Sequence, residues 1–210
     1  MPTSRLTRLT LSSFALLAAG AAHAAAPGPD YVLSPAHSTL TYTFTQAGAA
    51  NQGVFKSFSA QFDPHAGALT VVIDMRSFDT RDAQRNTLLG GAQFFDVARY
   101  PQARFTATRL RKTPSGFIAT GPLTLRGVSR TVSVPFTWRA LGRGAEELQG
   151  KTVIDRLTFG IGQGQWQATE WLGNPVTVRF ALQMVPAARI RACSNRSPRS
   201  STRTPGRSRS

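Results

Sequence analysis

The stretch GPLTLRGVSRTVSVPF, residues 121–136, decides the fold of this chain. Apolar residues alternate with polar ones up to a polar turn that carries Arg126 and Arg130, and the alternation resumes after the turn. Because a strand points successive side chains to opposite faces, the stretch predicts a two-stranded hairpin with one apolar face. That face points either at a second sheet or into the hollow of a barrel.

The same period of two recurs from Tyr31 to Val185, with turn-forming residues at short intervals. The pattern predicts about eight strands of ordinary length. Most connections between them are too short for parallel crossovers, so the predicted sheet is antiparallel. The predicted strands span residues 37–44, 54–62, 68–75, 103–108, 116–125, 131–138, 148–155 and 175–184.

One stretch, residues 77–101, breaks the period of two. Asp79 or Thr80 can cap a helix that runs to about Leu89, and Gly90 and Gly91 stop it. The stretch also carries leucine and phenylalanine residues that give it an apolar underside. We expect this short helical insert to cap the end of a barrel.

The two ends of the chain differ in composition from the part between them. Residues 1–26 have a basic head, roughly 14 apolar residues and small residues with A-x-A spacing, which predicts a signal peptide, because a bilayer span needs about 20. Residues 189–210 consist mostly of Arg, Ser, Thr and Pro, which predicts a disordered tail. The folded domain is therefore expected at residues 27–188, in a soluble periplasmic protein.

The basic charge of the chain is concentrated at these ends. The tail holds 7 of the 25 Lys and Arg residues and the signal peptide holds 2, so residues 27–188 carry 16 bases against 10 acids, a formal charge of +6 instead of +15. An Arg/Ser tail can bind phosphates, but an exported protein does not meet nucleic acid, so none is expected as a partner. Peripheral contact with anionic lipid is left open.

Two closed architectures suit eight short antiparallel strands: a sandwich filled by side chains, and a barrel that can hold one ligand. The inward positions carry many phenylalanines, which fit a solid core and an apolar tube equally well. Alternation alone does not separate the two architectures.

Five segments resemble, in order, those of the YceI-like family of exported, lipocalin-like proteins that bind polyisoprenoids. They are PAHSTLTYTF, GVFKSFSAQF, AQFFDVARYPQARFTAT, GPLTLRGVSRTVSVPF and DRLTFGIGQGQW. The resemblance covers Tyr31 to about Val185 and implies an all-β fold, an antiparallel eight-stranded lipocalin-like barrel with a long apolar pore. The chain departs from the family where members often carry Arg-Asp-x-His, because it has Asn86 and Thr87 there and no histidine.

With the barrel adopted, we expect non-enzymatic binding, storage or transport of an isoprenoid lipid, a quinone or a prenyl phosphate, in the periplasm. The candidates for contact with its head group are Arg126, Arg130 and Arg156, since guanidinium pairs well with phosphate. The candidates for the pore lining are Leu40, Tyr42, Phe44, Phe55, Phe58, Val71, Ile73, Phe105, Leu123, Leu125, Val132, Val134, Phe136, Phe159, Val178 and Phe180.

Other chemistries have little support in the sequence. No His/Cys cluster has the spacing of a metal site, and no Gly-x-Ser-x-Gly elbow is present, so neither a metal nor a cofactor is expected. The alternatives are a lipid-acting hydrolase or isomerase using carboxylates of the insert (Asp79, Asp82, Asp96), or a scaffold partner of a membrane redox protein. A homodimer is also open. The glycines of GIGQGQW, residues 160–166, predict a flexible crossing between the last strands.

Overall fold

The computed structural model describes residues 30–188. The predicted signal peptide and Arg/Ser-rich tail lie outside the described residues. Twelve strands form one sheet in which every pairing is antiparallel. The strands are β1 (Tyr31–Leu33), β2 (Thr39–Gln46), β3 (Ala49–Phe55), β4 (Phe58–Asp63), β5 (Ala68–Asp74), β6 (Phe78–Asp79), β7 (Gln102–Thr106), β8 (Arg109–Thr113), β9 (Gly116–Leu125), β10 (Val128–Gly142), β11 (Ala145–Asp155) and β12 (Pro175–Pro186).

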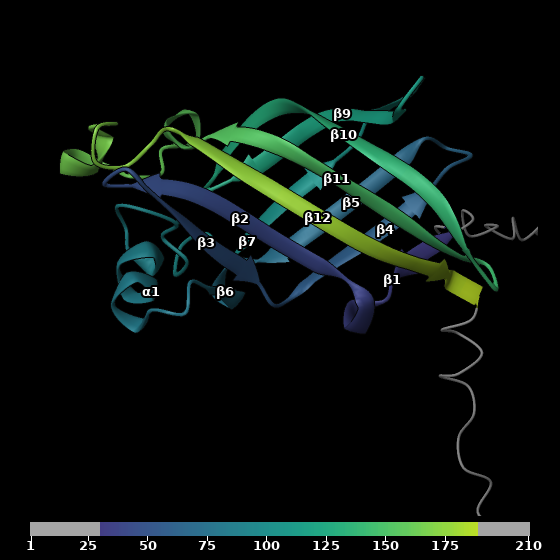
Figure 1. Cartoon of the computed structure of the whole chain (residues 1–210), viewed down its shortest axis with the longest axis horizontal. Coiled ribbons are helices and arrows are strands. Elements are labelled where there is room, and N and C mark those ends of the chain that lie inside the picture. The colour runs from purple at the N-terminus through teal and green to yellow at the C-terminus, as the bar shows by residue number, and fades with distance from the viewer. Residues whose placement is uncertain (1–29, 189–210) are drawn as a thin grey trace, which may run out of the picture.

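Eight of these strands close into a ring, which confirms the predicted barrel. The order around it is β1-β4-β5-β7-β9-β10-β11-β12, and β12 pairs back with β1. The remaining strands extend the wall: β2, β3 and β6 follow one another from the edge of β12, and β8 pairs with β9. Figure 1 shows the long strands running obliquely across the molecule.

The hairpin expected from residues 121–136 is present in β9 and β10. Val128 lies opposite Leu125, and the register continues without a break to the pair of Phe136 and Phe117. The turn residues Arg126 and Gly127 both have positive φ, 50° and 72°. Such angles suit the right-handed twist of a two-residue hairpin turn.

The helix of the insert is shorter than predicted. Helix α1 spans Ala83–Gly90, and its N-cap is Asp82, whose side chain accepts the backbone N–H of Arg85. The expected caps, Asp79 and Thr80, are used elsewhere, since Asp79 pairs with Lys56 and Thr80 donates to Asn86. The helix ends at Gly90 as predicted, with Gly91 as its C-cap.

Four short 3-10 helices complete the chain. They are η1 (Pro35–His37), η2 (Met75–Ser77), η3 (Arg156–Phe159) and η4 (Gly164–Gln167). The last two belong to the predicted crossing between β11 and β12, where Gly160, Gly162 and Gly164 all have positive φ. In the part of the chain that the structure describes, no helix is both long enough and apolar enough to cross a membrane.

The molecule has two different ends. We call the end that carries residues 30 and 188 and the β10–β11 turn the terminal end, and the end that carries α1 and residues 156–174 the loop end (Figure 1). A core cluster at the terminal end contains Phe62, Phe136, Leu148 and Met184. A second cluster at the loop end contains Tyr42, Phe94, Phe159 and Leu172.

Candidate functional site

A cavity of about 180 Å³ lies inside the barrel, and its surface is apolar. Its wall draws on both core clusters and on the insert, so it runs between the two ends of the molecule. The side chains that line it are Leu40, Tyr42, Phe44, Phe55, Leu69, Val71, Ile73, Met75, Leu89, Phe94, Phe95, Ala103, Phe105, Leu123, Leu125, Val132, Val134, Thr152, Ile154, Arg156, Ile161, Leu172, Val176, Val178, Phe180 and Leu182.

The residues that line the cavity extend along the barrel wall. On β12 alone, the wall includes the four alternate residues from Val176 to Leu182. A strand rises about 3.4 Å per residue, so these side chains cover roughly 20 Å along the strand. The shape suits a hydrocarbon chain better than a compact molecule.

Most of the wall residues that the sequence predicted do line this cavity. Phe58, Phe136 and Phe159 do not: Phe136 and Phe159 are buried in the core clusters, and Phe58 is half-buried against one of them. Phe136 stacks on Phe117 in the terminal-end cluster, with ring centroids 5.7 Å apart, and Phe58 packs against the same cluster. Phe159 lies in η3 and is buried in the loop-end cluster.

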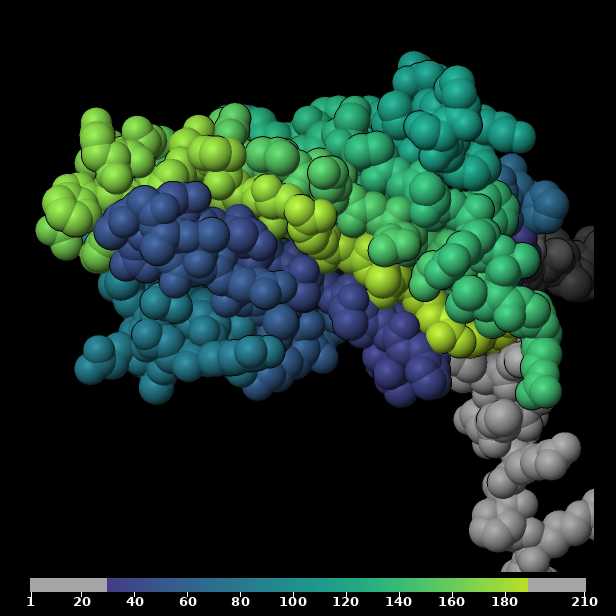
Figure 2. All heavy atoms as spheres, in the orientation of Figure 1, coloured from purple at the N-terminus to yellow at the C-terminus, as the bar shows by residue number. Residues whose placement is uncertain are grey.

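The predicted wall missed residues of two kinds. Leu69, Val176 and Leu182 are in phase with predicted wall residues on their strands, so the period of two contained the signal for them. Leu89, Phe94, Phe95, Ile161 and Leu172 come from the insert and the β11–β12 crossing, where no strand period applies. For these, only the apolar underside of the insert gave a hint. Figure 2 shows both segments gathered at the loop end beside the β2–β3 turn.

Arg156 is held inside the protein and does not project toward solvent. It is 3% exposed, and its guanidinium donates to the carbonyls of Gly173 (3.0 Å), Ile161 (2.9 Å) and Leu172 (2.6 Å). Burial lowers the pKa of its guanidinium. No described carboxylate lies within salt-bridge distance. The contacts tie the β11–β12 crossing to the barrel, which differs from the predicted head-group role.

The other two candidate arginines differ from one another. Arg130 is exposed, and its side chain donates only to the carbonyl of the adjacent Ser129, at 3.3 Å. Arg126 donates to the carbonyl of Ala92 at 2.7 Å, which joins the hairpin turn to the insert. Its Nε is buried and, like the indole N–H of Trp166, has no partner among the described residues. Arg126 therefore retains an unused donor at the loop end.

Tyr42 is the polar side chain deepest in the loop-end cluster. Its ring packs against Phe55 and Phe95, with centroids 5.0 and 6.5 Å away, and its hydroxyl is buried with no partner among the described residues. Desolvation by burial, followed by the charge of Asp79, raises the pKa of this phenol well above its ordinary value. Tyr42 therefore stays neutral and contributes an almost purely aromatic surface.

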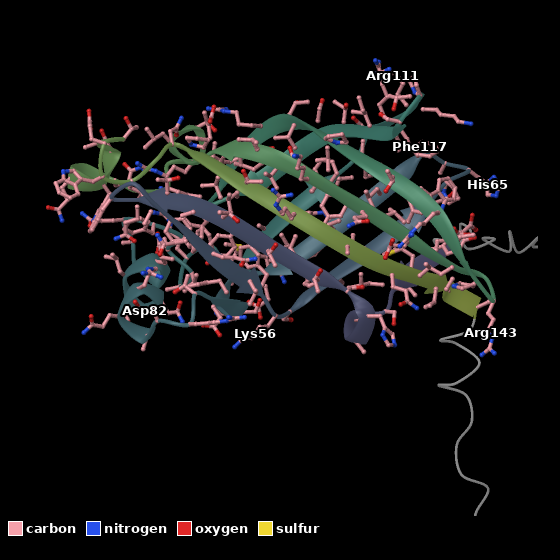
Figure 3. The ribbon with its side chains drawn as sticks, viewed as in Figure 1. Lys56, His65, Asp82, Arg111, Phe117 and Arg143 are labelled. Atoms are coloured by element: carbon pink, nitrogen blue, oxygen red, sulfur yellow. The ribbon has the colours of Figure 1, made fainter. Side chains whose placement is uncertain are left out.

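A polar cluster fixes the insert to the barrel outside the cavity. Lys56 Nζ lies 2.6 Å from a carboxylate oxygen of Asp79, whose other oxygen accepts from the side chain of Asn86 at 3.0 Å and the N–H of Arg81 at 2.8 Å. These bonds, with Lys56 first, hold the pKa of Asp79 well below its usual range. Figure 3 shows Lys56 and Asp82 on the side that carries α1, away from His65, Arg111 and Arg143.

Two of the three candidate carboxylates of the insert, those of Asp79 and Asp82, are engaged in local structure. Asp79 pairs with Lys56, Asp82 caps α1, and the backbone of Asp96 bonds within the loop that follows the helix. Across residues 30–188, no three His, Cys, Asp or Glu side chains gather as metal ligands would. The apolar cavity is thus the feature around which a function can be argued.

Comparison with known sequences finds one family profile, described as YceI-like domain, which matches residues 31–184. The proteins named YceI of Salmonella arizonae and Salmonella newport are each 36% identical to this chain over 104 residues. Each match covers 47% of this chain and 53% of the relative. The chain therefore spans about half the length of these curated relatives.

Solved structures share the fold over most of the described residues. BcnA of Burkholderia cenocepacia is 33% identical, with a TM-score of 0.67 over 72% of this chain and 98% of its own. A polyisoprenoid binding domain from Saccharophagus degradans, implicated in plant cell wall breakdown, is 20% identical, with a TM-score of 0.63 over 75% and 99%. The YCEI protein of Campylobacter jejuni is 25% identical, with a TM-score of 0.56 over 62% and 82%.

Proposed function

Because this chain belongs to the YceI-like family, we propose that it binds an isoprenoid lipid in its barrel and carries or stores the lipid without chemical change. The observation that carries the proposal is the long cavity with an apolar surface. The Saccharophagus degradans domain with the same fold is described as polyisoprenoid binding, which supports the assignment.

The size of the hydrophobic term favours a hydrocarbon ligand. An apolar cavity of about 150 Å³ stays dry and binds benzene, and the cavity here is about 180 Å³. Burial of ten methylenes at roughly 0.8 kcal/mol each would give about 8 kcal/mol, before the cost of ordering the chain. A net binding free energy of that size would correspond to a micromolar dissociation constant, and the ordering cost makes the affinity weaker than this. Apolar burial is therefore the main favourable term available to a ligand in this cavity.

The lipid class that we propose is a quinone or a prenyl phosphate, both of which have acceptor oxygens at one end. Arg126 is the side chain best placed to meet such an oxygen, since its Nε has no described partner at the loop end. Arg156 is occupied by three carbonyls, and Arg130 is solvated. The compartment that we propose is the periplasm, where an aqueous gap separates two membranes.

Native mass spectrometry of the full chain, purified from a bacterial host that exports it, tests this function. We expect a species heavier by the mass of one prenyl lipid, and uptake of an added long-chain quinone or prenyl phosphate by lipid-free protein. Val178→Trp, which fills the cavity, should abolish uptake, whereas Leu141→Trp, on the exposed side of β10, should not.

Two results would overturn the proposal. One is repeated recovery of lipid-free protein together with no uptake of either lipid in vitro. The other is turnover of the bound lipid in a panel of hydrolase and isomerase assays, because a carrier binds stoichiometrically and releases its ligand unchanged.

A further inference from the structure

Packed side chains lie at both ends of the cavity. At the terminal end, Phe136, Leu148 and Met184 belong to a buried core cluster. At the loop end, Phe94 and Leu172 are buried beside the cavity, and Arg156 donates to carbonyls of the β11–β12 crossing. Entry of a lipid chain at either end would require these packed side chains to move.

The hydrogen-bonded ladder between β10 and β11 is incomplete. It runs from Gly142 to the pair of Phe136 and Gly150, and no rung follows it. Both strands continue past that point, since β10 pairs with β9 back to Val128 and β11 pairs with β12 on to Asp155. The facing edges of residues 128–135 and 151–155 thus lack a ladder, and we call this stretch the seam.

Residues at the start of the seam explain why the ladder stops. Pro135 has no N–H to donate to β11. Gly150 lies against the Pro135 carbonyl and the Phe180 ring, with no room for a Cβ. Beyond this point one side-chain bond crosses the seam, from the Thr152 hydroxyl to the Ser133 carbonyl at 3.2 Å. An edge held by one such bond opens more readily than a full ladder.

The two edges of the seam are also walls of the cavity. Val132 and Val134 on β10 and Thr152 and Ile154 on β11 all line it. We propose that the seam is the entry route through which the hydrocarbon chain of the ligand passes sideways into the barrel. This inference rests on the proposed function and adds the path by which the ligand reaches the cavity.

The outer surface of the seam suits an amphiphilic ligand. On the outer face of β11, Val153 is 59% exposed, and the exposed Lys151 lies two residues before it. Lys151 forms no ion pair with another described residue. An apolar side chain beside a free cation can receive a tail while an anionic or electron-rich head stays outside.

A reversible cross-link tests the route. Ser133 and Val153 are exposed, and they oppose one another if the β10–β11 register is continued past Gly150. The pair Ser133→Cys and Val153→Cys, made in a Cys193→Ser background, should form a disulfide if the strands lie within about 7 Å. A short bis-maleimide linker replaces the disulfide if it does not form.

The measurement is the rate at which lipid-free protein takes up a long-chain prenyl phosphate from phosphatidylcholine vesicles. We expect the cross-linked protein to load at least tenfold more slowly, and reduction of the disulfide to restore the rate. Thr124→Cys with Ser129→Cys locks a pair that is already opposed in the β9–β10 ladder, and it should leave the rate unchanged.

A second cross-link separates the seam from the loop end. Gln93 and Gln163 join the insert to the β11–β12 crossing, where the Gln163 N–H donates to the Gln93 carbonyl. Cysteines at both positions should leave loading unchanged if the seam is the route. The inference is overturned if the protein cross-linked across the seam takes up lipid at the normal rate. It is also overturned if only the protein cross-linked at the loop end takes up lipid slowly. No uptake by the unmodified protein instead overturns the proposed function.

Discussion

Arg156 shows how one side chain can hold together the segments that enclose a cavity. The sequence made it a candidate for contact with a lipid head group. In the structure it is buried, and it donates to three backbone carbonyls of the crossing that closes the loop end. Buried carbonyls left without donors are costly, so the arginine lets an irregular segment close over an apolar cavity.

Replacement of Arg156 by methionine should therefore lower the free energy of unfolding by about 3 kcal/mol, because carbonyls of the crossing lose their donors. The matched control is Arg130→Met, which removes an exposed guanidinium and should change stability by less than about 0.5 kcal/mol. Urea unfolding of both variants measures the difference. Similar losses in the two variants would contradict the structural role of Arg156.

At the scale of elements, the regular parts of the fold could be predicted and the irregular parts could not. The strand predicted over residues 116–125 matches β9, and the hairpin with β10 has the expected register, since its alternation is unbroken. Strand β8 was missed because its sequence, RLRKT, is mostly charged. The helix begins at Ala83 because Asp79 is already bonded to Lys56, a contact between distant segments that no local pattern contains.

The same division applies to the candidate site. Wall residues on strands follow from the period of two, whereas those from the insert and the crossing depend on how these segments fold over the barrel. Phe136 and Val134 share one face of β10, yet only Val134 lines the cavity. Alternation gives the face of a strand, but the boundary between core and cavity depends on the packing of facing strands.

The bond network of Asp79, which fixes the insert, predicts a pH dependence. The pKa of Asp79 is lowered in the folded protein, chiefly by Lys56, so its contribution to stability is present above the unfolded value of about 3.9. That contribution is lost as the pH falls toward the pKa of Asp79 in the folded protein. The stability difference between the native protein and Asp79→Asn should therefore be largest above pH 5 and shrink below about pH 4.

Urea midpoints measured for both proteins across this pH range test the prediction, since the other carboxylates titrate alike in both and cancel. Lys56→Met provides a control background. Without the ammonium, the pKa of Asp79 is less depressed, so the stability difference between Lys56→Met and Lys56→Met/Asp79→Asn should shrink at a higher pH than it does when Lys56 is present. A difference that stays constant down to pH 2 would show that Asp79 does not stabilise the insert through its charge.

At the scale of the whole molecule, the solid core and the cavity occupy different parts of the barrel. The terminal end is filled by a buried core cluster, and the part of the barrel next to it encloses the cavity. This cluster limits how far a bound chain could extend. A closed barrel has no free sheet edges. In this barrel the ladder is interrupted along the seam, and the β7–β9 and β1–β4 ladders are short, with two paired positions each. Under the proposed function, a cavity that ends against solid core would select ligand chains by length.

This arrangement predicts how affinity depends on chain length. For alkyl phosphates with 8 to 16 carbons, the dissociation constant should fall by up to about fourfold per methylene while the chain still fits. It should stop falling once the chain reaches the terminal-end cluster. Leu182→Phe, at that end, should move the plateau to shorter chains, because the added ring occupies the last part of the tube. Titration calorimetry across the series measures both effects.

Val176→Phe is the matched variant at the loop end of the same strand. It should weaken binding of every chain by a similar factor and leave the length at the plateau unchanged, because every chain passes that point. Each variant needs an unfolding curve, since an added ring in a packed wall costs about 1–3 kcal/mol. An affinity that keeps rising with length in Leu182→Phe, as in the native protein, would mean that chains do not extend toward the terminal end.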